Sequence, residues 1–207
     1  MNKYKLIFVV ALVAVGGTQA RAGNIVLNGN FATGDLTDWT VNSSSSDPWQ
    51  VDTAGGHGND PYGSDTYFVS TGCVGAQCIT GTTSQQSSLS QILSDAVATT
   101  YTLTFEFGTG GNNTQNELDV LWDGTSVLDL GPGGTLGIVD DYQLYTVTGL
   151  VGTGSDTLTF LGRQDPGWDA LDDISVTGSS STPEPATFLL VGGILPVIGL
   201  ARRRRLY

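Results

Sequence analysis

The segment 101–107, YTLTFEF, alternates large apolar residues with polar ones at every step. Tyr101, Leu103, Phe105 and Phe107 therefore share one face of an extended chain, and the polar residues share the other. A helix repeats every 3.6 residues and would scatter these side chains around its circumference. The alternation predicts a half-buried strand whose apolar face must be covered by a second layer.

The segment 117–130, ELDVLWDGTSVLDL, combines the same alternation with a turn signal. Asp123-Gly124 separates two apolar runs, and both residue types accept the positive φ angles that a two-residue hairpin turn requires. The sequence therefore predicts an antiparallel hairpin, with one face formed by Leu118, Val120 and Trp122.

Short strand patterns recur along the rest of the chain, separated by Gly, Asn, Asp and Ser. Only 89–98 has weak helical character. Because no repeat or change of composition divides residues 23–178, they predict one all-β domain, an antiparallel β-sandwich of jelly-roll type. The further strands are expected near 24–27, 38–41, 49–51, 66–70, 142–147, 157–161 and 173–176.

The N-terminal segment has the features of a secretory leader. Lys3 and Lys5 precede the apolar run 6–15, and Ala20-Arg21-Ala22 has the small-x-small pattern that signal peptidase cleaves. Residues 1–22 are therefore expected to be a signal peptide. A short buried helix or a permanent anchor is the alternative, although the run is short for a membrane span.

The charge of the body limits its partners. Residues 23–182 contain nineteen of the twenty acidic residues and one basic residue, Arg163, which gives a formal charge of −18. Such a field repels phosphate backbones, so nucleic-acid binding is excluded. Metal cations, calcium above all, are compatible with it, and solubility alone is the simpler explanation.

The C-terminus predicts a second membrane-directed element. Segment 186–201 is uncharged and mostly apolar, but its sixteen residues span only about 24 Å of a ~30 Å hydrocarbon core as a helix. A Ser/Thr linker, 179–182, and an extended, accessible motif, Pro183-Glu184-Pro185, precede it. The Gly and Pro residues within 186–201 argue against a helix in the core of a soluble domain. A basic cluster follows and favours the cytoplasmic side: Arg202, Arg203, Arg204 and Arg205.

Pro183, Glu184 and Pro185, the apolar segment and the arginine cluster together resemble the PEP-CTERM sorting signal over residues 183–207. The resemblance implies recognition and removal of the tail by exosortase, a membrane-embedded cysteine transpeptidase-like enzyme. It implies export across the inner membrane, transient anchoring by a transmembrane helix, and a final place at the cell surface or in the extracellular matrix. The nucleophile would belong to exosortase, so no catalytic residue is expected in this chain.

The body carries a second resemblance. NIVLNGNFATGDLTDWTV (24–41) and GWDALDDISVTG (167–178) are similar to the first and last strands of galactose-binding-like jelly rolls, which include carbohydrate-binding modules. The resemblance implies that these segments pair side by side and sometimes hold structural calcium, with no other cofactor required. Ala32 stands where the family has a carboxylate. Asn30, Asp172 and Asp173 are the candidate ligands; alternatively the aspartates cap a turn or bond a neighbouring strand.

Cys73 and Cys78 are the only cysteines, and in an exported protein they predict a disulfide. Metal binding is the alternative, with His57 the sole histidine. The sequence gives little support for an enzyme, because no nucleophile motif surrounds His57 and no pair of carboxylates is distinguished as a candidate for glycoside hydrolysis.

Two tryptophans in polar surroundings, Trp49 and Trp168, are candidate platforms for sugar rings, and packing at the ends of the sandwich is the alternative. Trp39 and Trp122 lie in strand patterns and are expected in the core. The sequence thus predicts a non-enzymatic, exosortase-sorted surface or matrix protein that binds carbohydrate or exopolysaccharide. A passive matrix component and, less favoured, a glycan hydrolase are the alternatives.

Overall fold

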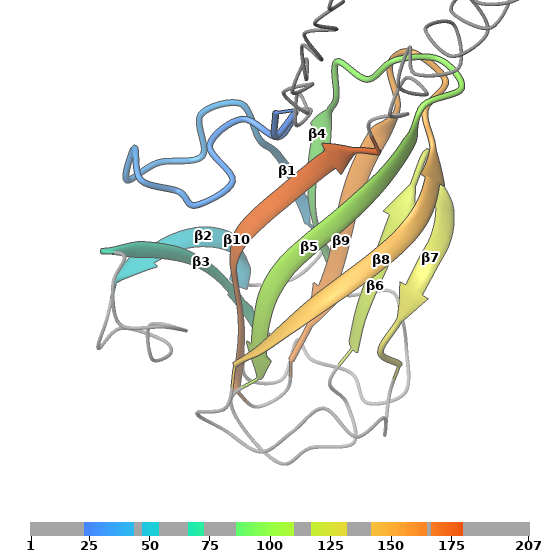
Figure 1. Cartoon of the computed structure of the whole chain (residues 1–207). Coiled ribbons are helices and arrows are strands. Elements are labelled where there is room, and N and C mark those ends of the chain that lie inside the picture. Colours follow the sequence, from blue (N-terminus) through green and yellow to red (C-terminus); the bar gives the residue numbers. More distant parts are fainter. Residues whose placement is uncertain are drawn as a thin grey trace, which may run out of the picture. The chain divides into compact units, whose positions relative to one another are not determined.

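The alternating segments assemble into two antiparallel sheets of five strands each, packed face to face (Figure 1). The computed structural model describes residues 23–43, 47–53, 66–72, 86–109, 117–131, 142–164 and 167–179, and these contain strands and no helix. Sheet A has the order β2-β3-β10-β5-β8, and sheet B has the order β1-β4-β9-β6-β7. The described part of the chain is therefore all-β, with the two-layer arrangement of a jelly-roll sandwich. The strands are β1 (Thr40–Ser43), β2 (Asp47–Thr53), β3 (Tyr67–Gly72), β4 (Ser87–Ile92), β5 (Thr100–Thr109), β6 (Glu117–Trp122), β7 (Thr125–Asp129), β8 (Gln143–Val151), β9 (Thr157–Arg163) and β10 (Trp168–Gly178).

Strand β5 has the orientation that its alternation predicts. Its odd-numbered residues from Tyr101 to Phe107 are buried, and the even-numbered ones from Thr102 to Glu106 are partly exposed. In β10, Leu171 pairs with Phe107, and in β8, Tyr145 pairs with Phe105. Because pairing partners point to the same face of a sheet, these registers separate an inner from an outer face in sheet A.

The hairpin predicted at Asp123-Gly124 joins β6 to β7. Both turn residues have positive φ, 47° and 76°, as the favoured two-residue hairpin turn requires. The inward side chains of β6 are buried. The prediction of this hairpin is confirmed.

Aromatic side chains from both sheets form the centre of the core. Phe105 of β5 meets Phe160 of β9 edge to face, with ring centroids 5.2 Å apart. Trp39 and Trp122 are 7% and 6% exposed, so their predicted core positions are confirmed. Such contacts add to the burial of apolar area that holds two sheets together.

One weak local signal and one predicted strand differ from the structure. Weak helical character at 89–98 gave way to β4, in which Ser87, Leu89 and Gln91 point inward and the residues between them outward. Pairing with β1 and β9 supplies the backbone hydrogen bonds that outweigh the local preference. Segment 24–27 forms one isolated bridge, between Asn24 and Thr177, where a strand was expected.

The predicted terminal signals and the disulfide lie outside the described residues. This applies to the signal peptide with Ala20 and Ala22, to Cys73 and Cys78, to His57, and to the whole of 183–207. Within the described ranges, no helix has the length and apolar character needed to cross a membrane. The sorting signal, the leader and the disulfide stay predictions.

Candidate functional site

The N-terminal segment lies against β10, as the second resemblance implies. The Ile25 amide donates to the Val176 carbonyl at 3.0 Å, and the Ile174 amide donates to the Gly29 carbonyl at 2.9 Å. A Cβ at position 29 would lie 2.1 Å from the Ile174 oxygen, so this close approach requires glycine. The Asn-Gly motif therefore has an architectural role.

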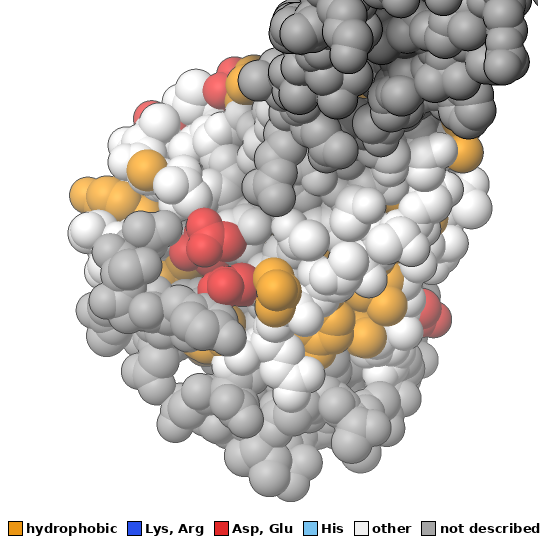
Figure 2. Space-filling model, in the orientation of Figure 1, with side chains coloured by type: hydrophobic (Ala, Val, Ile, Leu, Met, Phe, Trp, Pro, Cys, Tyr) orange, Lys and Arg blue, Asp and Glu red, His pale blue; other side chains and the backbone are white. Residues whose placement is uncertain are grey.

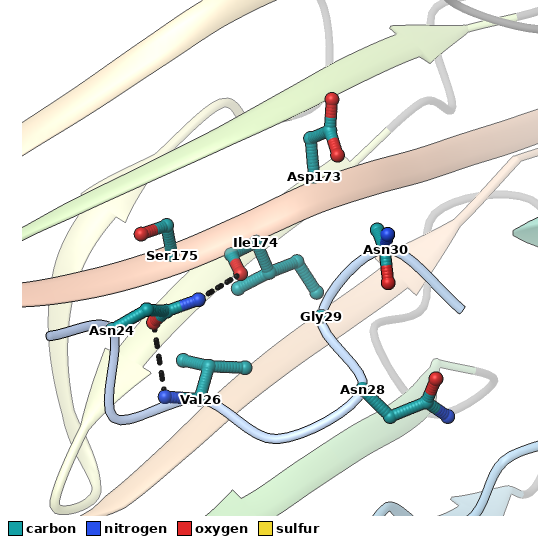
Figure 3. Close-up of a pocket in the computed structure, with 8 residues that line it drawn as sticks. All are labelled: Asn24, Val26, Asn28, Gly29, Asn30, Asp173, Ile174 and Ser175. Carbon is teal, nitrogen blue, oxygen red and sulfur yellow. Dashed lines mark hydrogen bonds between the residues drawn. The ribbon is translucent and has the colours of Figure 1, made fainter. Parts of the chain in front are cut away.

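A polar hollow of about 360 Å³ lies where this segment meets β10 (Figure 3). The Asn24 carbonyl oxygen accepts hydrogen bonds from the amides of Val26 at 3.0 Å and Val176 at 2.9 Å. Its amide nitrogen reaches the Ile174 carbonyl at 3.5 Å. Asn24 is thus committed to holding the two segments together. The hollow is lined by Asn24, Val26, Asn28, Gly29, Asn30, Asp173, Ile174 and Ser175.

The three candidate calcium ligands do not meet at one point. Asn30 and Asp173 line the hollow, but Asp172 is buried elsewhere in β10, and its Oδ1 accepts the Asp173 amide at 2.8 Å. A register shift between Asp172 and Ser175, with φ 49° at Asp173, turns the two carboxylates apart. Calcium takes six to eight oxygens, and of the three predicted ligands only Asn30 and Asp173 line the hollow, so the predicted ligand set does not assemble there. In the described ranges, no three His, Cys, Asp or Glu residues lie close enough together to hold a metal ion.

Trp49 is a core residue, and its assignment as a sugar platform was wrong. It is 2% exposed and points inward from β2. Its indole N–H donates to the Ser87 carbonyl at 2.9 Å, and its amide donates to Ser87 Oγ at 2.9 Å. Neighbouring Pro48 and Asp47 made the segment look like a loop, but pairing with β3 makes it a strand. The packing alternative holds for this residue.

Trp168, by contrast, remains half-buried at the start of β10. Its strand partner is Gly72 of β3, and a Cβ on Gly72 would lie 3.1 Å from the indole ring. The ring therefore lies against the backbone of β3. Since Asp169 and Leu171 face the core, Trp168 and Ala170 belong to the outer face of sheet A.

Tyr142 is a second aromatic residue on this face, and it was not among the residues predicted to bind sugar. Tyr142, just before β8, lies against Gly108 of β5, where a Cβ would be 2.7 Å from the ring. Gly108 pairs with Ala170, the small residue two positions after Trp168. Trp168 of β10 and Tyr142 before β8 thus lie on the same outer face, and β5 lies between those two strands. A glycine inside a strand often marks the close approach of another group. Gly72 and Gly108 are therefore the sequence features that could have indicated the positions of these two rings.

Acidic and apolar side chains continue this outer face. Asp172 pairs with Glu106, and Glu106 pairs with Leu144, which is 61% exposed. On β2 and β3, Ser70 Oγ donates to Asp52 at 3.1 Å. Figure 2 views this face and shows Asp and Glu side chains beside hydrophobic ones. Rings that stack and carboxylates that accept hydroxyl hydrogen bonds are the groups by which proteins bind sugars.

The two glutamates of the body do not form a hydrolytic pair. Glu106 belongs to the outer face of sheet A, and Glu117 points outward from sheet B. Burial is the main cause that raises the pKa of Glu117, and hydrogen bonding to Gln86 opposes it. Two packed sheets lie between these carboxyls, whereas glycosidase pairs lie about 5–10 Å apart.

No protein-family model matches the sequence, and no curated protein matches it. Solved structures match the fold. TmCBM61, solved with β-1,4-galactotriose, is 18% identical, with a TM-score of 0.50, over 75% of this chain and 99% of its own. The K3 cleaved adhesin domain of Lys-gingipain from Porphyromonas gingivalis W83 is 19% identical, with a TM-score of 0.51, over 73% and 98%. The enzymatically active domain of bacteriophage CBA120 tailspike protein 4 is 15% identical, with a TM-score of 0.52, but the match spans only 21% of its length.

Proposed function

We propose that this protein is an exported surface or matrix protein that binds polysaccharide through the outer face of sheet A. The observation that carries the proposal is the pair of rings, Trp168 and Tyr142, each lying against a strand glycine on the outer face of sheet A. Likeness of fold to a carbohydrate-binding module and to an adhesin domain supports it.

The chemistry of the face defines the glycan. Sugar rings stack on Trp168 and Tyr142 through their apolar C–H faces, while Asp52 and Glu106 accept hydrogen bonds from hydroxyl groups. The formal charge of −18 on residues 23–182 repels anionic polymers. Neutral glycans are therefore the preferred ligands.

Binding to a glycan array tests the proposal. Residues 22–179 form one compact unit, so a fragment covering 23–182 is a suitable probe, assayed with calcium and with a chelator. Trp168→Ala and Tyr142→Ala are expected to weaken binding. Ile92→Ala is the matched control, because Ile92 is 72% exposed but lies on sheet B. Absence of any saturable ligand would favour a passive matrix component instead.

A hydrolase is distinguished by its products. Asp172 and Glu106 are paired residues on the proposed binding face. Their carboxyls are the candidate catalytic groups if reducing ends are released from a bound glycan. Loss of that release in Asp172→Asn would replace the binding proposal with an enzymatic one. Binding without release supports the proposal as stated.

Delivery to the surface is proposed to follow the terminal signals. Signal peptidase removes 1–22, the segment 186–201 anchors the chain transiently, and exosortase cuts at or near Pro183-Glu184-Pro185. Glu184→Ala, or deletion of the arginine cluster, should leave the full-length chain in the membrane fraction. Unchanged release and an unchanged mass of the released product would contradict this route.

A further inference from the structure

Polar residues replace apolar ones at one end of the sandwich interior. Thr109 ends β5, Gln164 follows β9, and Asp169 lies near the start of β10; all three side chains are buried. Thr109 continues the inner face of Phe107, and Asp169 continues that of Leu171. The group therefore lies between the two sheets, where apolar residues would be expected.

Thr109 and Gln164 are in direct contact across the sandwich. Gln164 Nε2 donates a hydrogen bond to Thr109 Oγ1 at 2.6 Å, in a buried contact between residues 55 positions apart. The amide carbon, Cδ, is one C–N bond, about 1.33 Å, from Nε2. The hydroxyl oxygen is thus held beside the amide group, between two buried side chains, and such fixed proximity replaces a bimolecular encounter.

Asp169 completes the group. It pairs with Thr109 in the register of β10 and β5, so the two side chains are neighbours on one face. It is fully buried, and neither carboxyl oxygen has a hydrogen-bond partner of good geometry. Burial raises the pKa of Asp169 well above its usual range, and the Thr109 side chain opposes this in part. Burial thus favours the neutral form of the carboxyl, which can donate a proton from one oxygen while it accepts one at the other.

A buried carboxyl without a well-formed hydrogen bond is costly, and native proteins rarely retain one without a use. A simple packing role would be served equally well by Leu or Val at position 169. The combination of a nucleophile, an acyl group and a two-oxygen proton carrier in one dry site is what acyl transfer requires.

We propose that Thr109 and Gln164 become joined by an intramolecular ester bond, formed within this chain with Asp169 as the proton carrier. Thr109 Oγ1 attacks Gln164 Cδ, and its proton passes to one oxygen of Asp169. The proton on the other oxygen passes to Nε2, the Cδ–Nε2 bond breaks, and ammonia leaves. Asp169 ends the reaction as the neutral acid, and no oxidant or cofactor is consumed.

The link would fasten sheet A to sheet B. Thr109 belongs to the central region of sheet A, between β10 and β8, and Gln164 continues a central strand of sheet B. Burial of both residues excludes water and so protects the ester from hydrolysis. Escape of ammonia from the site makes the reaction effectively irreversible.

Mass spectrometry of the full chain, purified in detergent and reduced, tests the proposal. The expected mass is lower by one ammonia molecule than the mass calculated for the chain between its observed termini, and proteolysis should yield a branched peptide that contains both Thr109 and Gln164. Hydroxylamine should separate its two arms. Thr109→Val and Gln164→Met should abolish the branched peptide, and Asp169→Asn should slow its formation at least about 100-fold.

The controls separate the ester from other losses of ammonia. Thr71→Val is the matched variant, because Thr71 pairs with Asp169 from the other side and donates to the Asp47 carbonyl at 2.9 Å; it should keep the branched peptide, as should Thr109→Ser. A succinimide at Asn28-Gly29 also loses ammonia but persists in Thr109→Val and gives no branched peptide. A folded wild-type chain with the unmodified mass, or a mass loss that survives Thr109→Val, would overturn the proposal.

Discussion

Replacement of Trp49 by Phe tests whether this residue contributes to the stability of the core or to glycan binding. Trp49 is 2% exposed and donates its indole N–H to the Ser87 carbonyl at 2.9 Å. The substitution leaves that buried carbonyl without this donor, which costs about 1–3 kcal/mol, and it opens a void beside Gly162. We expect a total loss of about 2–4 kcal/mol in the free energy of unfolding.

That loss is large against the 5–15 kcal/mol or so typical of a domain. At about 2–4 °C per kcal/mol for a chain of this size, the melting temperature should fall by roughly 5–15 °C. Glycan binding, measured at a temperature where both proteins are folded, should not change, because the indole has no exposed face.

Trp168→Ala should behave in the opposite way. The half-buried ring lies on the outer face, so its loss should weaken glycan binding at least tenfold, about 1.4 kcal/mol, with a smaller effect on melting. Thermal melts and isothermal titrations of both variants provide the comparison. Weakened binding and an unchanged melting temperature in Trp49→Phe would refute the assignment of Trp49 to the core.

Three further predictions concern the buried end of the sandwich. Asp169 keeps its proton in the folded state at pH values where the unfolded chain has lost it, so wild-type stability should fall as pH rises from about 4 toward the raised pKa of Asp169, by up to about 1.4 kcal/mol per pH unit. Urea melts across pH should show that slope reduced in Asp169→Asn, and an equal slope in both proteins would contradict the burial argument. Gly162→Ala places a Cβ 2.5 Å from the Trp49 ring and should cost about 1–3 kcal/mol in urea unfolding; a neutral result would mean that the ring packs elsewhere. If the ester closes the 55-residue loop, its loss in Thr109→Val should lower stability by about 4 kcal/mol, and equal melts of Thr109→Val and Thr71→Val would argue that no covalent link contributes.

Local sequence pattern was sufficient for the parts of the fold that depend on local chemistry. The alternation of 101–107 predicted β5, and Asp123-Gly124 predicted the hairpin, because side-chain period and turn conformation are properties of neighbouring residues. The pairing of the N-terminal segment with β10 was anticipated only through a family resemblance. Nothing local to Asn24 indicates a partner 152 positions away.

The candidate site was harder to predict because strand pairing decides which face a side chain occupies. Trp49, beside Pro48, appeared to be in a polar loop, but pairing with β3 turned it into the core. Tyr142 packs against Gly108 of β5, and Thr109 of sheet A is hydrogen-bonded to Gln164, which follows β9 of sheet B. These contacts depend on register, and a change of one residue in register would reverse each side chain's face.

Affinity electrophoresis of the 23–182 fragment through neutral polysaccharides tests the central claim most directly. The proposal predicts that at least one neutral glycan retards the wild-type fragment and the Ile92→Ala control equally. It predicts that Trp168→Ala and Tyr142→Ala migrate as they do in the absence of glycan. Retardation that both ring variants retain in full would contradict binding through the outer face of sheet A.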